Sequence, residues 1–352
     1  MSEERPSEER PSEERPPEES LNTQGGRRGW IWLGVFWLVA VLAFGGGGVT
    51  LAVLGPPAAP TAELALAPIE TPPPAPPPPR GVPESLARHV DPALVEFTAA
   101  GALPRIGPDG RMPMRAYARP FDRQDPRPRV ALILGGIGLR AGLSEEAIRT
   151  LPRNVALAFT PYAPNPIPLI EAARERGFET LLALPMEPTG FPMNDPGHRA
   201  LLTGLSAGEN AQRLEWLLAR FPGHVGAVGA LTSMRGDRFA ALAEPFAQMQ
   251  LALNARGLLY FDARPGAPHP QRAWGFTVDV VVDEPHTRGE IEQRLAQLER
   301  LARERGGALG YLGEVTPVSL ERLAAWSGGL DARGVALAPV TALVRRPEIA
   351  TR

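Results

Sequence analysis

The apolar residues of this chain follow a periodic pattern from about residue 128 onward, where runs of five or six mainly apolar residues alternate with longer amphipathic segments. Strand-sized runs separated by helix-sized segments predict an α/β fold, a parallel sheet with helices on its outside. Eight runs over about 220 residues favour an irregular (β/α) barrel of seven or eight units over an open sheet. The runs are VALIL (130–134), VALAF (155–159), TLLAL (180–184), AVGAL (227–231), LLYFD (258–262), TVDVVV (277–282), ALGYL (308–312) and VALAPV (335–340).

The predicted helices have recognisable first and last residues. Gly177 and Gly257 each lie shortly before an apolar run, where a glycine commonly ends a helix. Two residue pairs fit the capping box that begins a helix, Ser206 with Glu209 and Thr287 with Glu290. These signals place helix boundaries between the predicted strands.

An uncharged segment of 26 residues, 29–54, precedes the periodic region. A bilayer core takes about 20 residues of helix, so this segment is long enough to cross it once. Arg27 and Arg28 lie directly before it and the next arginine is Arg80, which places the N-terminus in the cytoplasm and the main domain on the far side. A cleaved signal peptide is the alternative, and it fits less well because 28 residues precede the segment and Pro56 follows it.

Composition divides the rest of the chain into three regions. Residues 1–28 contain three copies of SEERP, a repeat without an apolar face, and are expected to form a disordered, solvated tail. Residues 55–102 are rich in proline and predict an extended spacer. Residues 103–346 hold the periodic pattern and predict the main domain.

The residue content excludes several classes of function. The net charge is −2 and no basic stretch is interleaved with aromatic residues, so nucleic acid is not an expected partner. The chain has no cysteine, which excludes thiolate metal sites and a cysteine nucleophile. All 37 basic residues are arginine, which excludes Schiff-base chemistry and a P-loop lysine.

The first apolar run ends in two glycines, Gly135 and Gly136. Such a glycine turn could bind a phosphate, or it could occupy a position from which catalytic side chains have been lost. The spacing of Gly136, Gly138 and Gly142 does not match the dinucleotide loop, and the next run ends without an acidic residue. The glycine turn is therefore not expected to bind a nucleotide.

Carboxylates follow four of the apolar runs, at the strand ends where a barrel places its chemistry. They are Glu187, Asp262, Asp283 and Glu314. No two of the five histidines have helical or strand spacing, and each is expected to be a surface or loop residue. Carboxylates without histidine suit Ca²⁺ or Mg²⁺ better than a hydrolytic zinc ion.

From about Leu103 to Leu343 the chain resembles the divergent polysaccharide deacetylase family. The resemblance implies an irregular (β/α) barrel of the carbohydrate-esterase type in a bacterial protein that is exported or tethered to the membrane. It also implies kinship with enzymes that remove acetyl groups from amino sugars with a divalent metal such as zinc. The matching stretches, in order, are DGRMPMRAYARPFD, LAFTPYAP, LLALPMEP, RLEWLLARFPGHVGAVG, GLLYFDAR, VDVVVDE and VALAPVTALV.

The chain departs from the family pattern where the catalytic residues are expected. Gly135 and Gly136 occupy the positions of the family's Asp-Asp pair, and Ser233 occupies that of a histidine. The family's closing Gly-His-Pro is replaced here by Gly313, Glu314 and Val315. The resemblance therefore implies a degenerate metal site that lacks both the base and a nitrogen ligand.

Three acidic residues keep the family pattern, Glu187, Asp262 and Asp283. With Glu314 they are the candidates for substrate binding, whereas no catalytic residue, bound metal or other cofactor is expected.

Three hypotheses for function follow. The leading one is a protein anchored in the bacterial inner membrane by a single helix, with a non-catalytic periplasmic domain that binds a cell-envelope glycan or an envelope protein. The second is an active metal-dependent deacetylase with a rearranged carboxylate site. The third is a structural scaffold of the envelope in which the end of the barrel is closed.

Overall fold

The computed structural model describes residues 34–39 and 89–347. The chain divides into two units, Met1–Pro76 and Pro77–Arg352. In the first unit, residues 34–39 are helical and exposed. None of the described helices is both long and apolar enough to span a membrane. Most of the predicted span 29–54 lies outside the described residues, so the membrane anchor stays a prediction.

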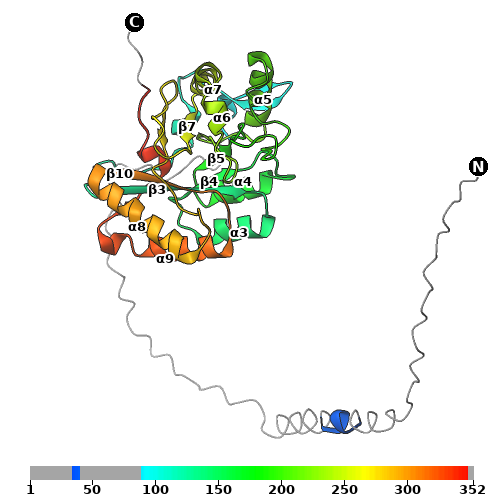
Figure 1. Ribbon diagram of the computed structural model, residues 1–352, viewed down its shortest axis with the longest axis vertical. Coiled ribbons are helices and arrows are strands. Elements are labelled where there is room, and N and C mark those ends of the chain that lie inside the picture. The colour runs from blue at the N-terminus through cyan, green and yellow to red at the C-terminus, as the bar shows by residue number, and fades with distance from the viewer. Residues whose placement is uncertain (1–33, 40–88, 348–352) are drawn as a thin grey trace, which may run out of the picture. The chain divides into compact units, whose positions relative to one another are not determined.

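The second unit is built on a curled sheet of parallel strands (Figure 1). Its hydrogen-bonded order is β8-β7-β6-β5-β4-β3-β10-β9, and β11 pairs with the first residues of β3. The sheet strands are β3 Arg129–Ile137, β4 Ala156–Phe159, β5 Thr180–Ala183, β6 Gly226–Val228, β7 Leu259–Asp262, β8 Gly275–Thr277, β9 Val280–Val281, β10 Gly307–Leu312 and β11 Ala336–Leu337. Each of the predicted apolar runs contributes to this sheet.

One segment of chain, 275–281, bonds to both ends of the strand path. Its first part is β8, which pairs with β7, and its last part is β9, which pairs with β10. Between them the Val278 amide donates to the Asp262 carbonyl and the Asp279 amide to the Leu309 carbonyl, each at 2.8 Å. The run predicted as one strand over 277–282 is thus divided between two neighbours, and the sheet curls into a half-barrel whose two edges this segment joins.

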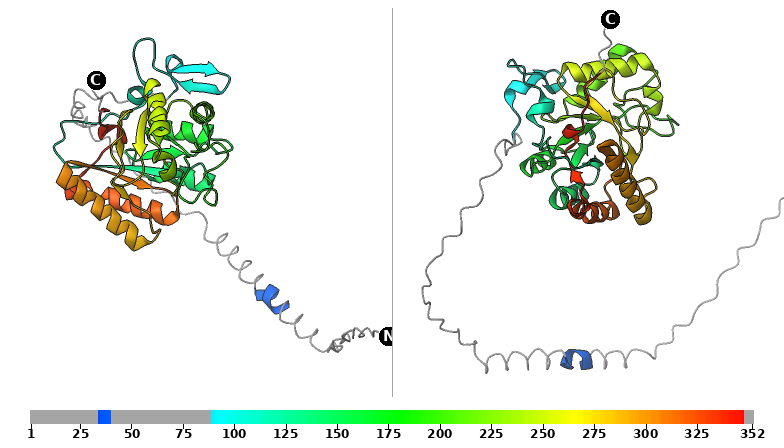
Figure 2. Two further views of the ribbon diagram at one scale, coloured as in Figure 1. Left: turned by 45° about the horizontal axis from the view of Figure 1, so that its top comes forward. Right: turned by 90° about the vertical axis from the view of Figure 1, so that its left-hand side faces the viewer.

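Helices lie around the outside of this sheet (Figure 2). They are α3 Ala141–Thr150, α4 Ile167–Glu175, α5 Ala207–Leu218, α6 Asp237–Ala240, α7 Ala243–Ala255, α8 Arg288–Arg305 and α9 Pro317–Gly328. A short hairpin, β1 Val95–Thr98 with β2 Gly101–Pro104, and the one-turn helix α2 Pro113–Ala116 precede the sheet.

The predicted helix boundaries are mostly confirmed. Ser206 and Glu209 form the full capping box at the start of α5. At α8 only half of it forms, because the Thr287 side chain accepts from the Glu290 amide without the reciprocal bond. Gly177 and Gly257 follow the ends of α4 and α7 with φ of 82° and 68°, the left-handed geometry that glycine supplies at a helix end.

Two apolar clusters fill the domain, one on each face of the sheet. Alternate residues of β3 separate them: Leu132 packs in the outer cluster with the helices, and Ile133 in the inner cluster within the barrel. Both faces of the sheet are therefore buried, which explains why the strand sequences are continuously apolar and do not alternate with polar residues.

The last described residues cover the amino ends of the strands. The short helix η3 Val340–Ala342 places Val340 in the inner cluster, and Tyr117, directly after α2, joins it there. Glu179, which is buried, holds this cover in place. Its carboxylate accepts from the Thr341 hydroxyl at 2.5 Å and from the Arg119 amide at 2.8 Å.

The buried Glu179 carboxyl predicts a pH dependence of stability. Burial raises its pKa above the usual value of 4.5, although the bonds from Thr341 and Arg119 oppose this. The folded state then binds more protons than the unfolded state between the two pKa values. The free energy of unfolding therefore falls as the pH rises from about 4.5 through the higher pKa of the folded state. Glu179→Gln, uncharged at every pH, removes this contribution.

We therefore expect the wild type to gain stability relative to Glu179→Gln as the pH is lowered from about 7.5 to about 4.5. Urea unfolding of both proteins across this range measures the difference. Glu175→Gln, an exposed change on α4, is the control. A difference between wild type and Glu179→Gln that does not change with pH would contradict the prediction.

Candidate functional site

The glycine turn lies within a strand rather than after one. β3 runs through Gly135 and Gly136 to Ile137, and its register against β4 shifts between Leu134 and Ile137. Gly136 has φ of 71°, which a residue with a side chain rarely adopts. The two glycines therefore form an irregularity in β3 at the carboxyl end of the barrel, where the family's acidic pair is expected.

The space beside Gly135 is filled by protein atoms. A Cβ atom added there would lie 2.7 Å from the Tyr311 hydroxyl and 3.1 Å from the carbonyl oxygens of Leu312 and Gly313. The Tyr311 ring is fully buried inside the barrel, and its hydroxyl donates to the Thr232 carbonyl at 2.8 Å. No side chain at position 135 fits without displacing this tyrosine.

Ser233 belongs to a tight loop that lies over the end of β10. Leu231 and Met234 bond to each other across this loop, and Thr232 between them has φ of 53°. A Cβ added at Gly313 would lie 2.8 Å from the Thr232 carbonyl group and 3.2 Å from the Ser233 nitrogen. The loop after β6 is therefore in direct contact with the strand end that carries Glu314.

These contacts narrow the carboxyl end of the barrel. A cavity of about 80 Å³ lies there, lined by Gly136, Leu139, Arg140, Glu314 and Val315. Sites for small molecules are commonly about 300 Å³ or larger. This cavity is too small to hold a sugar residue.

Glu187 is used to hold a loop. One of its oxygens accepts from the Thr203 amide at 2.6 Å and from the Thr203 hydroxyl at 2.8 Å. The other lies 2.9 Å from the Arg238 guanidinium. Only 3% of the Glu187 side chain is exposed, and the charge of its buried carboxylate is balanced by the Arg238 guanidinium.

Asp262, at the end of β7, is paired with Arg264. The guanidinium donates to both carboxylate oxygens, at 3.0 and 2.6 Å, and the Arg264 amide also donates to the first of them at 3.0 Å. This two-point geometry is among the strongest carboxylate interactions in proteins. It leaves Asp262, which is buried, without a free oxygen for a ligand.

Asp283 is fully buried and braces the end of β10. One oxygen accepts from the amides of Gly313 and Glu314, at 2.8 and 3.0 Å. The same oxygen lies 3.7 Å from Nδ1 of His286. Burial raises the pKa of the Asp283 carboxyl, against the lowering effect of the two amide bonds. Its second oxygen has no hydrogen-bond partner among the described residues.

The structure thus brings some of the predicted site residues together and separates others. Gly135, Gly136, Ser233, Asp283 and Glu314 meet through direct contacts around the end of β10. Glu187 and Asp262 are each tied to their own arginine instead.

Sequence reasoning missed the residue that fills the acid position, Tyr311. It also missed the partners Thr203, Arg238 and Arg264. Of these, only Arg264 has a local signal, since it follows Asp262 by two residues.

The side chains present do not fit a hydrolytic zinc site. Such a site needs three protein ligands that include nitrogen donors or free carboxylates. Within residues 34–39 and 89–347 no group of three or more histidine, aspartate or glutamate side chains is arranged to hold an ion. Two of the four candidate carboxylates are already paired with arginine.

The sequence model of the divergent polysaccharide deacetylase family matches residues 132–344, more than half of the chain. The chain therefore belongs to this family. A crystal structure of an uncharacterized protein from Agrobacterium tumefaciens is similar, with 33% identity and a TM-score of 0.64. The similarity covers 69% of this chain and 99% of that one.

A second solved structure is the catalytic domain of a peptidoglycan N-acetylglucosamine deacetylase from Eubacterium rectale. It shares 13% identity over 60% of this chain and 88% of that one, with a TM-score of 0.37. No curated protein matches the chain.

Restoring a side chain at the glycine turn should destabilise the fold. Gly135→Ala places a methyl group against the Tyr311 hydroxyl, and overpacking of this kind costs about 1–3 kcal/mol. Urea unfolding of the full chain measures the loss. Gly142→Ala is the matched control, because an added Cβ there meets nothing within 4 Å and α3 gains a better helix former.

Combining Gly135→Ala with Tyr311→Phe should lose less stability than the sum of the two single changes, because the phenylalanine has already removed the clashing oxygen. If Gly135→Ala is as stable as wild type, the space beside Gly135 is not filled as described.

Proposed function

We propose that this domain has lost the deacetylase reaction and binds cell-envelope carbohydrate without cleaving it. The observation that carries the first part is the Tyr311 hydroxyl beside Gly135, in the space that an acidic side chain would need. The binding role is supported by membership of a family named for polysaccharide deacetylation.

Deacetylation requires a group that activates water and a group that stabilises the charge on the carbonyl oxygen. Gly135, Gly136 and Ser233 supply neither. Glu187 and Asp262 cannot replace them, because each is neutralised by a neighbouring arginine. Asp283 keeps one oxygen without a partner among the described residues, but its side chain is fully buried beneath the end of β10 and out of reach of a substrate in solution.

A scaffold without a ligand is the second candidate function. The closed carboxyl end of the barrel, with its cavity of about 80 Å³, favours it over any ligand bound at the family's usual place. A carbohydrate-binding role therefore requires a different surface of the domain.

Acetate release and binding to peptidoglycan together test the proposal. We expect the full chain in detergent to release no acetate above background from N-acetylglucosamine oligomers, with or without added zinc. We also expect it to sediment with insoluble peptidoglycan. Acetate release by the wild type that Asp283→Asn abolishes would establish the rearranged hydrolase. If neither release nor sedimentation is seen, the scaffold is the function that remains.

We also propose that residues 29–54 anchor the protein in the bacterial inner membrane and that the domain lies in the periplasm. The support is the uncharged segment itself, with arginines close to it only on its N-terminal side.

The anchor predicts both attachment and orientation. The full chain should stay in the membrane fraction after a carbonate wash, and a periplasm-dependent phosphatase fused after Arg80 should be active. A fusion that ends at Gln24, before the segment, should be inactive and is the control. A soluble mature protein that begins near residue 55 would show instead that the segment is a cleaved signal peptide.

A further inference from the structure

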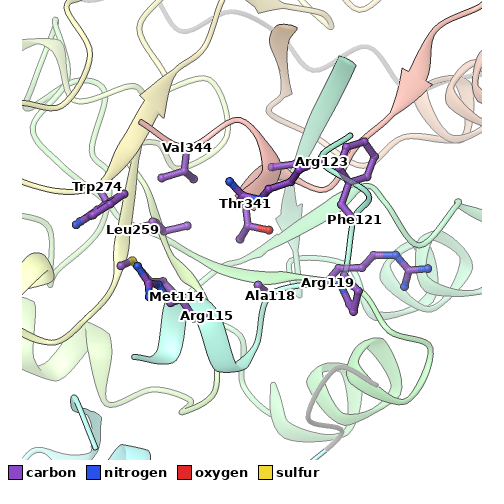
Figure 3. A pocket seen from close by; sticks show the side chains of 12 residues that line it. Met114, Arg115, Ala118, Arg119, Phe121, Arg123, Leu259, Trp274, Thr341 and Val344 are labelled. Atoms are coloured by element: carbon purple, nitrogen blue, oxygen red, sulfur yellow. The ribbon is translucent and has the colours of Figure 1, made fainter. Parts of the chain in front are cut away.

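A second cavity of the domain lies among the segments at the amino ends of the strands, at the opposite end of the barrel from the glycine turn. Figure 3 shows the side chains that line it. Its volume is about 620 Å³, within the range of small-molecule sites. It is lined by α2 with the loop that follows it, the first residue of β7, Trp274 before β8, and the chain from Thr341 to Val344. This pocket is formed by the segments that cover the amino ends of the strands.

The charged residues that line this pocket are all positively charged. Arg115, Arg119 and Arg123 line it, and none of its lining residues is acidic. Within the described residues none of these three arginines forms an ion pair; Arg115 and Arg123 are exposed. In Figure 3 the Arg123 side chain extends from its loop toward Thr341.

Arg119 is held in place by neutral groups. Its guanidinium donates to the Asn154 side chain and to the Gly177 carbonyl, each at 2.9 Å. Burial and the nearby charge of Arg153 lower the pKa of Arg119, which nonetheless stays protonated. Glu179, which is buried, accepts from the Arg119 amide and from the Thr341 hydroxyl but does not line the pocket. The pocket therefore keeps an excess of positive charge.

The pocket also has apolar and aromatic walls. Met114, Leu259 and Val344 line it together with Trp274, whose ring is partly exposed. A ligand consisting only of a small anion would leave these walls in water. A ring that carries an anionic group would contact both the guanidinium groups and the aromatic surface.

We infer that this pocket binds a sugar that bears a phosphate or carboxylate group. Guanidinium groups pair with both of these anions through two parallel hydrogen bonds, and the ring of the sugar packs against Trp274. The inference rests on the proposed carbohydrate-binding function and assigns it to the amino end of the barrel, away from the closed carboxyl end.

Titration of the full chain in detergent with four compounds tests the inference. The probes are N-acetylglucosamine 1-phosphate, N-acetylmuramic acid, neutral N-acetylglucosamine and inorganic phosphate. We expect one or both of the anionic sugars to bind at least about tenfold more tightly than the neutral sugar, as charged hydrogen bonds imply. Comparison of the first two probes shows whether phosphate or carboxylate is preferred.

Two variants assign the binding to this pocket. Arg115→Gln combined with Arg123→Gln should weaken binding of the anionic sugar at least about tenfold. Unfolding curves should stay unchanged because both side chains are exposed and neither forms an ion pair with a described residue. Arg149→Gln, an exposed arginine on α3 without an ion pair to a described residue, is the matched control and should bind as the wild type does. Trp274→Phe should weaken binding of the sugar more than binding of inorganic phosphate.

Several results would overturn the inference: no binding of either anionic sugar, an equal loss in Arg149→Gln, or inorganic phosphate binding as tightly as the sugar phosphate. The proposed function is judged separately by acetate release and sedimentation. A chain that sediments with peptidoglycan equally well in the wild type and in the double variant would keep the proposed function and reject this pocket.

Discussion

The hydrogen bond from the Tyr311 hydroxyl to the Thr232 carbonyl determines what the carboxyl end of this barrel can do. It holds the tyrosine in the space beside Gly135 and fixes the loop of Ser233 over the end of β10. Because Tyr311 is fully buried, losing this bond would leave polar atoms without partners in the interior, a loss of about 1–3 kcal/mol. Tyr311 thus belongs to the packed interior of the barrel, and the loop of Ser233 lies over it at the surface.

Three of the carboxylates at the strand ends, Glu187, Asp262 and Asp283, are bound by groups of the protein itself. A carboxylate that binds a metal or a substrate must keep oxygens free, and free buried charge is costly. Gly135, Gly136 and Ser233 supply no ligands for a metal ion, so a bound ion would not offset the cost of burying these carboxylates. Arginine compensates Glu187 and Asp262. Two backbone amides compensate one oxygen of Asp283, while its other oxygen has no partner among the described residues. The acidic residues that keep the family pattern in sequence therefore bind protein groups in this fold.

The two ends of the barrel differ in what they leave open. At the carboxyl end, residues from β6 and β10 touch, and the cavity that remains is smaller than a sugar. At the amino end, α2 and η3 cover the inner cluster but leave a pocket of about 620 Å³ with three arginines. Glu179 supports that pocket by binding both Thr341 and the Arg119 backbone. The glycine turn and the arginine pocket are thereby separated by the length of the barrel.

The sequence alone determined the elements and the likeness to the family. Strand and helix periods depend on local alternation of apolar residues, and Gly177, Gly257 and Ser206 mark boundaries through backbone geometry and capping that involve only near neighbours. The sequence also showed glycine at positions 135 and 136, where the family pattern has acidic residues, because residue identity can be compared without a structure.

Tertiary structure decided the rest. Whether a carboxylate is free depends on partners distant in the chain, such as Arg238 for Glu187, 51 residues away. The closure of the barrel by one segment, the tyrosine beside Gly135 and the arginine pocket all join residues from strands and loops whose proximity no local pattern encodes. Long-range contacts set these features because the curling of the sheet, rather than the order of residues along the chain, brings the strand ends together.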